Sequence, residues 1–243
     1  MKFNGPLTPA RLIKRYKRFL ADVEILSGVD SGKKLTAHCP NPGALMGLGV
    51  PGATVWLSHS DNPKRKLAYT YELEEVEREG EQFLVGVNTM RPNTIAEEAI
   101  RDNFIPELGQ IQTLLREQRY GKNSRIDLLH VDEATGSKTF IEIKNVHLVR
   151  RGKHLEFPDC VTARGAKHLD ELSDVVRQGD RAAMVFVSQW PGAETIGVAR
   201  DLDPAYGEAM DRAVDAGVEV YGLSCRVDTE AIEAEYRLTF VNP

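Results

Sequence analysis

Three charged side chains stand in two segments whose other residues are mostly those of buried β-strands. Asp127 lies within Ser124–Leu129, and Glu142 and Lys144 lie within Phe140–Lys144. Charged groups on such strands are costly to bury unless they pair with one another or bind an ion. The three side chains are therefore candidates for one chemical site.

The segment between them, Asp132–Ser137, consists largely of turn-forming residues, so the two segments are predicted to form a β-hairpin. If the turn is symmetric about its centre, Asp127 faces Glu142 across the ladder, with the two Cβ atoms about 4.5–5.5 Å apart. Lys144 lies two residues beyond Glu142 and shares its sheet face. The hairpin would thus gather two carboxylates and one ammonium group.

Two facing carboxylates repel each other, and a divalent cation removes the conflict. Oxygen ligands suit Mg²⁺ or Mn²⁺, and Mg²⁺ typically uses one or two carboxylates while waters and substrate phosphate complete its shell. The pattern therefore favours a phosphodiesterase centre at Asp127 and Glu142. A solvated face, on which Asp127, Glu142 and Lys144 form ordinary surface ion pairs, fits this short spacing equally well.

The hairpin resembles the core of PD-(D/E)xK nucleases, in which an Asp on one strand and a Glu-x-Lys on the next build the metal site. Further similarity extends over nearly the whole chain, in Arg15–Val23, His38–Gly43, Ser124–Asp127, Glu142–Val146, Phe157–Asp159 and Arg164–Leu169. On these segments the sequence resembles the SfsA (sugar fermentation stimulation protein A) family. Family members often have Thr in place of Pro42 and Arg-Met in place of Ala44 and Leu45, so contacts made by those side chains do not carry over.

The resemblance implies an N-terminal OB-like β-barrel, a PD-(D/E)xK nuclease-like α/β sandwich, and a DNA-binding role. It also implies an acidic metal ligand on the first helix of the nuclease-like domain, where Glu98 stands; Glu98 could equally be a surface residue. The family name refers to sugar metabolism, but no group of residues in the chain specifically supports a sugar-handling enzyme.

The net charge of −5 is unevenly distributed along the chain. Residues 1–70 contain 11 Lys and Arg against 4 Asp and Glu, which leaves −12 for residues 71–243. Basic side chains bind nucleic-acid phosphates in a sequence-independent, salt-sensitive way. The basic end is thus the candidate DNA-binding surface, although such a face can also serve solubility alone. The candidates there are Arg11, Arg15, Lys17, Arg18, Lys64, Arg65 and Lys66.

Two aromatic residues, Tyr16 and Phe19, lie among these charges and could stack on bases, as aromatic residues of OB folds do. For Phe19 we favour a place in the barrel core. His38 and Asn41 belong to the turn His38–Gly43, whose side chains and backbone N–H groups could meet phosphate. The Pro and Gly residues of this turn could instead fix a barrel corner.

The chain is predicted to divide into an OB-like domain at residues 1–86 and a nuclease-like domain at residues 87–243. Short strand-like segments separated by Gly, Pro and Asn predict the barrel, namely Phe19–Ile25, Lys34–His38, Thr54–Ser58, Leu67–Val76 and Gln82–Val87. Beyond these segments helical and strand patterns alternate, which is typical of a sheet covered by helices.

Thr94 and Glu97 have the spacing of a capping box, which predicts a helix start at Thr94 and a structural role for Glu97. A second helix is predicted within Val161–Val176. On it Arg164 and His168 are four residues apart and share a face, so either could contact the scissile phosphate. The pattern then predicts a strand, a helix closed by glycine and another strand, at Ala182–Val187, Tyr206–Ala216 and Val218–Leu223.

The N-terminal residues lack the apolar segment of a signal peptide, and no apolar run approaches the length of a membrane span. A cytoplasmic protein without a membrane partner is expected. Cys39, Cys160 and Cys225 are odd in number and widely spaced, so reduced thiols are expected. An open strand edge could support a homodimer.

The sequence therefore predicts a Mg²⁺- or Mn²⁺-dependent deoxyribonuclease. Asp127 and Glu142, with help from Glu98, would bind the metal ion, and Lys144 would hold or polarise the attacking water. The alternative is a non-catalytic DNA-binding regulator of sugar-metabolism genes that retains a nuclease fold. Fold-level resemblance does not decide between the two functions.

Overall fold

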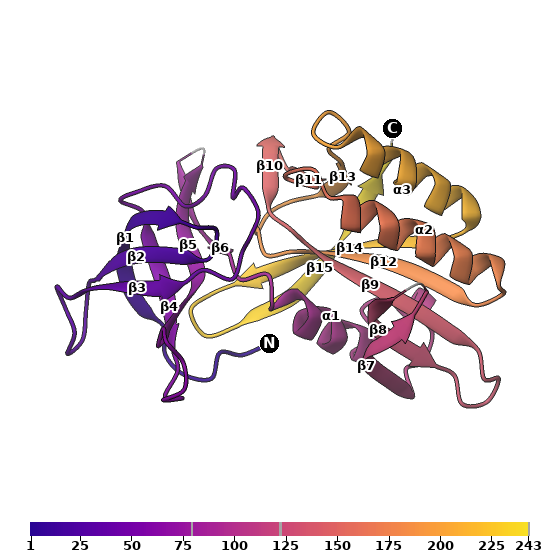
Figure 1. Ribbon diagram of the computed structural model, residues 1–243, viewed down its shortest axis with the longest axis horizontal. Helices are drawn as coiled ribbons and strands as arrows, with labels where there is room; N and C mark the ends of the chain where they lie inside the picture. The colour runs from indigo at the N-terminus through magenta and orange to yellow at the C-terminus, as the bar shows by residue number, and fades with distance from the viewer. Residues whose placement is uncertain (79, 122, 243) are drawn as a thin grey trace.

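The computed structural model describes residues 1–78, 80–121 and 123–242. Within these residues the strands form one six-stranded and one nine-stranded sheet. Figure 1 shows the first sheet as a barrel at one end of the molecule and the second as a long twisted sheet with helices on both sides. The fold is therefore mixed α/β with two β-rich units.

The N-terminal unit is an OB-like barrel. Its strand order is β3-β2-β1-β4-β5-β6, and a bridge between His38 and Thr70 joins β3 to β5 and closes it. On β2, Ala21, Val23 and Ile25 are buried, the period-2 pattern of a strand with one face on a core. The predicted barrel is confirmed. Its strands are β1 (Thr8–Tyr16), β2 (Leu20–Ile25), β3 (Lys34–His38), β4 (Thr54–His59), β5 (Tyr69–Arg78) and β6 (Glu81–Gly86).

Strand β1 was not predicted, since the first strand was expected at Phe19–Ile25, after the basic residues of β1. Ala10 and Leu12 face the barrel core while Arg11 is exposed. After Leu12 a bulge shifts the register against β2, so the simple alternation stops where Lys14 begins the more basic half. The charged outward positions and the bulge together interrupt the alternation of apolar and polar residues that predicts a strand.

The second unit is an α/β sandwich. Its sheet has the order β10-β11-β13-β15-β14-β12-β9-β8-β7, with β9, β12 and β14 parallel at the centre. The central strand β12 is covered on both faces, which explains its continuous apolar run. The strands are β7 (Thr113–Tyr120), β8 (Ser124–Val131), β9 (Lys138–Val146), β10 (Leu148–Arg151), β11 (His154–Phe157), β12 (Arg181–Ser188), β13 (Thr195–Val198), β14 (Glu219–Val227) and β15 (Ile232–Val241).

Helices cover both faces of this sheet (Figure 1). α1 (Pro92–Arg101) shares a core with Ala183 and Val185 of β12, whereas α2 (Ala163–Arg177) and α3 (Pro204–Ala216) share the other core with Met184. A short 3-10 turn, η1 (Pro106–Leu108), follows α1. α3 ends at Gly217 in the left-handed conformation, as predicted. In the described ranges, none of the helices has both the length and the apolar character needed to cross a bilayer.

The predicted capping-box start of α1 at Thr94 is wrong. The helix begins at Pro92, and Arg91 occupies the N-cap position without a side-chain capping bond. Proline suits the first helical position because its fixed φ is helical and its missing N–H is not needed there. Glu97 does not turn back to the backbone; its carboxylate pairs with Arg101 and with Arg116 of β7.

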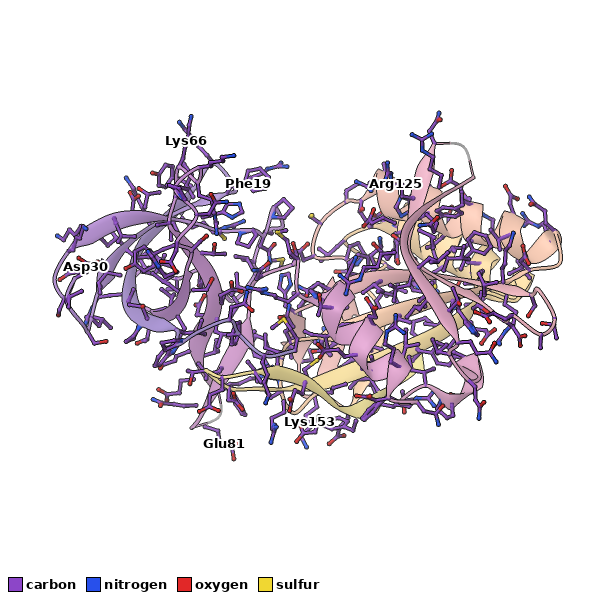
Figure 2. All side chains as sticks on the ribbon, turned by 90° about the horizontal axis from the view of Figure 1, so that it is seen from below. Phe19, Asp30, Lys66, Glu81, Arg125 and Lys153 are labelled. Carbon is purple, nitrogen blue, oxygen red and sulfur yellow. The ribbon has the colours of Figure 1, made fainter. Side chains whose placement is uncertain are left out.

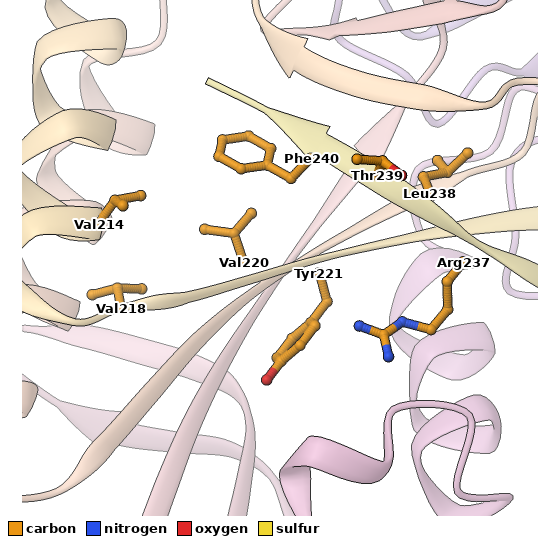
Figure 3. A pocket seen from close by; sticks show the side chains of 8 residues that line it. All are labelled: Val214, Val218, Val220, Tyr221, Arg237, Leu238, Thr239 and Phe240. Carbon is orange, nitrogen blue, oxygen red and sulfur yellow. The ribbon is translucent and has the colours of Figure 1, made fainter. Parts of the chain in front are cut away.

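The large sheet forks where β14 and β15 separate. The two strands pair as far as Gly222 and Leu238; beyond that point β14 continues beside β12 and β15 beside β13. A pocket of about 650 Å³ lies in the fork (Figure 3). None of the residues predicted for chemistry lines it. Its lining is Val214, Val218, Val220, Tyr221, Arg237, Leu238, Thr239 and Phe240.

Candidate active site

The predicted hairpin register is confirmed on β8 and β9, where Leu128 pairs with Ile141 and the pairing continues to the turn. This register places Asp127 beside Glu142. At Asp127, the backbone ladder gives way to a side-chain contact, because its Oδ2 accepts a hydrogen bond from the backbone N–H of Ile143 at 2.7 Å. The carboxylate is thereby anchored to the neighbouring strand.

The second oxygen of Asp127 meets a residue that the sequence analysis missed. Asn93, in the first turn of α1, donates from Nδ2 to Asp127 Oδ1 at 2.9 Å. Burial and the nearby charge of Glu142 raise the pKa of Asp127 to about 6, against the hydrogen bond from Ile143. The predicted clash of two carboxylates is thus present in the fold.

Glu142 is almost fully buried, and its two oxygens have unequal surroundings. Oε1 accepts from Lys144 Nζ and from His168 Nδ1, the latter at 2.5 Å. Oε2 is buried and has no hydrogen-bond partner. Burial alone would raise the pKa of Glu142, but the His168 hydrogen bond and the Lys144 charge together lower it. The side chain is therefore held as a carboxylate in which one oxygen lacks a hydrogen-bond partner.

His168 is a buried hydrogen-bond partner of Glu142. It lies on α2 and is buried, and its Nε2 lies 3.3 Å from Arg164 Nε. Since the Arg164 guanidinium can only donate, Nε2 accepts and the ring proton sits on Nδ1, pointing at Glu142. Both ring nitrogens are engaged, so the predicted contact between His168 and a phosphate is not available in this arrangement. Arg164 remains on the surface of the site.

These residues line one cleft of about 550 Å³ between the barrel and the sandwich. Seven of the lining residues were predicted from the sequence, namely Arg18, Asn41, Asp127, Glu142, Lys144, Arg164 and His168. The barrel contributes a second wall. The other lining residues include Pro42, Gly43, Thr89, Asn93, Asn145, His147, Asp159, Cys160 and Val161.

The fold does not bring Glu98 to this cleft. Its carboxylate lies 2.5 Å from the Met1 ammonium group, and its side chain is half exposed. α1 turns Asn93 toward Asp127 instead, five residues earlier in the chain. The helix thus supplies an orienting amide to the site in place of the predicted third carboxylate.

The remaining donors suit a hard divalent cation. Asp127 and Glu142 supply carboxylate oxygens. The buried Oε2 of Glu142 has no hydrogen-bond partner, and a bound ion would provide one interaction for it. Among the described residues, no cluster of three His, Cys, Asp or Glu side chains could enclose an ion. Two carboxylates with an open cleft match Mg²⁺-type sites, where waters and substrate complete the shell.

Asp159 joins the two units at the edge of the cleft. Its Oδ2 accepts from the backbone N–H of Leu45 at 3.3 Å and lies 3.3 Å from His147 Nε2. Burial raises the pKa of Asp159, but its contacts with His147, Cys160 and the Leu45 N–H together lower that pKa to about 2. Gly43 packs so closely that an added Cβ would lie 2.6 Å from the same carboxylate. Asp159 therefore connects the units and does not cap α2, whose N-cap is Thr162.

Several predicted DNA-binding residues hold the barrel together. Arg15 donates to the backbone oxygens of Asn41 and Gly43 at 2.5 and 2.8 Å. The Asn41 side chain is buried and donates to Val87 O at 3.0 Å, while the Tyr16 hydroxyl donates to Asp22. These contacts favour the corner-fixing interpretation of the 38–43 turn. Few donor groups of Arg15, Tyr16 or Asn41 therefore remain to contact a phosphate.

The other predicted residues of the barrel are partly or largely exposed. His38 is half-buried, and burial lowers its pKa. Phe19, expected in the core, is instead 47% exposed. Figure 2 shows Phe19 and Lys66 on the same side of the molecule as Arg125 of β8, opposite Glu81 and Lys153. The exposed cations among the predictions are Arg11, Lys17, Arg18, Lys64, Arg65 and Lys66, of which Arg65 also donates to Thr70.

Comparison with known proteins agrees with this two-unit organisation. A family model described as "SfsA N-terminal OB domain" matches residues 13–87, and one described as "Sugar fermentation stimulation protein RE domain" matches residues 90–231. A sugar fermentation stimulation protein homolog from Azorhizobium caulinodans is 52% identical over 233 residues, covering 96% of each chain. A homolog from Brucella melitensis biotype 1 is 49% identical over 234 residues, covering 96% of this chain and 94% of the relative.

One solved structure is similar over the full length of the chain. It is described as the structure of Pyrococcus furiosus SfsA in complex with Ca²⁺. The two folds agree with a TM-score of 0.83 at 27% sequence identity, covering 99% of this chain and 98% of the other.

Proposed function

The chain belongs to the SfsA family, and from that premise we propose that it is a DNA-binding protein that hydrolyses DNA phosphodiesters with a divalent cation. The observation that carries the proposal is the buried Glu142 Oε2, which has no hydrogen-bond partner and belongs to a carboxylate beside Asp127 in an open cleft. A structural carboxylate at this depth would normally be satisfied on both oxygens. An open one is suited to a ligand.

Asp127 and Glu142 are the residues that would hold Mg²⁺ or Mn²⁺. When bound, such an ion lowers the pKa of attacking water and offsets negative charge that develops on the phosphate. The Pyrococcus furiosus relative is described in complex with Ca²⁺, which is also a hard cation with oxygen ligands. That description supports the use of a divalent ion in this family fold without deciding which one is used here.

The surrounding side chains would orient and balance these carboxylates. Asn93 fixes the rotamer of Asp127, and His168 directs Glu142 by occupying Oε1. Lys144, already at Glu142 Oε1, would offset the charge of the pentavalent phosphorus species. In the hydrolysis, water oxygen bonds to phosphorus, the bond to one ester oxygen breaks, and a proton passes to that leaving oxygen.

DNA would lie on the side of the molecule that carries Lys66, Phe19 and Arg125 (Figure 2). Arg18 from the barrel and Arg164 from α2 both line the cleft and could neutralise phosphates of a strand bound there. Binding through such contacts is salt-sensitive and largely independent of base sequence. A cytoplasmic location is part of the same proposal, and a homodimer stays a prediction.

Asp127→Asn and Glu142→Gln test the proposal, with Asp215→Asn on the exposed end of α3 as a matched control. Each protein is incubated with single- and double-stranded DNA in Mn²⁺, Mg²⁺ or chelator, and cleavage and binding are scored in parallel. The expected result is metal-dependent cleavage by wild type and the control. Both site variants should lose at least about 10³-fold in rate, because several kcal/mol of charge stabilisation depend on the site.

DNA binding should survive in both site variants, since the cations that would contact phosphate are unchanged in them. Equal cleavage by wild type and Glu142→Gln would refute the assigned site. Binding without cleavage on any substrate, in every metal, would instead favour the DNA-binding regulator that keeps the fold without the reaction.

A further inference from the structure

Phe19 is the one Phe, Tyr or Trp side chain that is exposed in the part of the chain the structure describes. Its residue is 47% exposed, whereas the other aromatic residues are buried or partly buried. About half of the surface of this residue therefore stays in water, where it gains nothing from burial in the barrel core. The ring is therefore free to contact a ligand.

The backbone under this ring is held in place. Lys17 and Arg18 lie in the turn between β1 and β2 with φ of 50° and 64°. Residues other than glycine adopt this left-handed backbone conformation at a cost in free energy. Arg15 donates to Arg18 O at 3.2 Å, and the Cys39 N–H donates to Phe19 O at 2.8 Å. Phe19 therefore lies in a β-hairpin turn whose backbone is fixed by hydrogen bonds.

The neighbours of Phe19 are cations, and one of them belongs to the cleft. Lys17 and Arg18 are exposed, and Arg18 lines the same cleft as Asp127 and Glu142. Figure 2 shows Phe19 and Lys66 on the side of the molecule that also carries Arg125. An aromatic face beside paired cations is the combination that binds a nucleic-acid strand, since the base stacks while its phosphates are neutralised.

We propose that Phe19 is a nucleobase-stacking residue that selects unpaired bases, so that the preferred substrate is single-stranded DNA or a single-stranded segment entering the cleft from the barrel. This inference rests on the DNA-binding role proposed above. In a duplex each base is already stacked and its faces are covered, so Phe19 gains nothing without unstacking a base. Lys17 and Arg18 would contact the flanking phosphates and act on either form of DNA.

The test measures binding of a fluorescein-labelled oligo(dT) strand, and of the same strand annealed to oligo(dA), in chelator so that no cleavage occurs. The proteins are wild type, Phe19→Ala, Phe19→Leu, Phe19→Trp and Val29→Ala. Val29 is a fully exposed apolar residue next to Asp30, which Figure 2 places at the far end of the barrel. Leucine keeps an apolar side chain without a ring face, and tryptophan keeps the face.

Phe19→Ala and Phe19→Leu should weaken single-strand binding by about 5- to 150-fold, which corresponds to about 1–3 kcal/mol of base stacking. Duplex binding should change less than about 2-fold, and Phe19→Trp should bind the single strand at least as well as wild type, with its fluorescence quenched on binding. Val29→Ala should match wild type.

Equal single-strand affinity of wild type and Phe19→Ala, with DNA binding intact, would overturn the stacking role and leave the proposed function standing. An equal loss on both DNA forms would also overturn it, because the ring would then not read unpaired bases. No DNA binding by wild type would remove the proposed function and this inference together.

Discussion

Two buried glutamates, one in each unit, differ in how their oxygens are satisfied. Glu72 of the barrel accepts from Ser58 and Arg91 on Oε1 and from Asn88 and Arg91 on Oε2. Glu142 of the sandwich accepts twice on Oε1 and not at all on Oε2. The same side chain, buried to the same degree, is saturated in one unit and open in the other.

The difference separates a structural carboxylate from a candidate catalytic one. A buried charge is tolerated when paired and fully hydrogen-bonded, as Glu72 is. Leaving a buried oxygen unpaired carries a desolvation cost that folding does not recover. For Glu142, a ligand bound at Oε2 would offset that desolvation cost. Burial of an acidic residue is therefore less informative than the state of each oxygen.

The largest expected change in stability comes from breaking the saturated site. Glu72→Ala leaves the Arg91 guanidinium without its carboxylate and should lower the free energy of unfolding by about 3 kcal/mol, the low end for a buried pair because Arg91 is 31% exposed. Chemical denaturation of Glu77→Ala, an exposed glutamate on the same strand β5, serves as the control. A Glu72→Ala protein as stable as this control would contradict the structural role.

The open site should respond to metal. If Mn²⁺ or Mg²⁺ binds the folded state, a concentration 100 times its Kd stabilises wild type by about 2.7 kcal/mol, seen as a higher Tm than in chelator. Asp127→Asn and Glu142→Gln should lose this response. An unchanged metal response in both variants would place the ion elsewhere.

The smallest expected effect concerns positioning. His168→Ala frees Glu142 Oε1 from its ring donor and should lower cleavage about 10- to 100-fold, with a higher metal concentration needed for half-maximal rate. His168→Asn, whose amide can donate from a position near Nδ1, should restore part of the rate. Asp174→Ala, an exposed change on the same helix, is the control. A lower rate with no shift in metal requirement and no rescue would indicate a purely structural role.

Five of the six barrel strands, four sandwich strands (β8, β9, β12 and β14) and both long helices of the sandwich follow from local pattern, because burial on one or two faces leaves a period in the sequence. The sandwich strands β7, β10, β11, β13 and β15 were not predicted. Two other misses have local causes. In β1 the outward positions are charged and a bulge interrupts the period after Leu12. At α1, the capping-box residues Thr94 and Glu97 lie inside a helix that proline had already started.

The chemistry of the hairpin follows from local sequence. Turn composition and the two-residue period of strands place Asp127, Glu142 and Lys144 together within about twenty residues, so no distant contact was needed. The partners of these three side chains depend instead on how distant elements pack. Asn93 and His168 come from separate helices, the cleft needs both units, and Phe19 is exposed because the barrel core closes without it. Such contacts depend on how distant segments pack, and local periodicity carries no record of that packing.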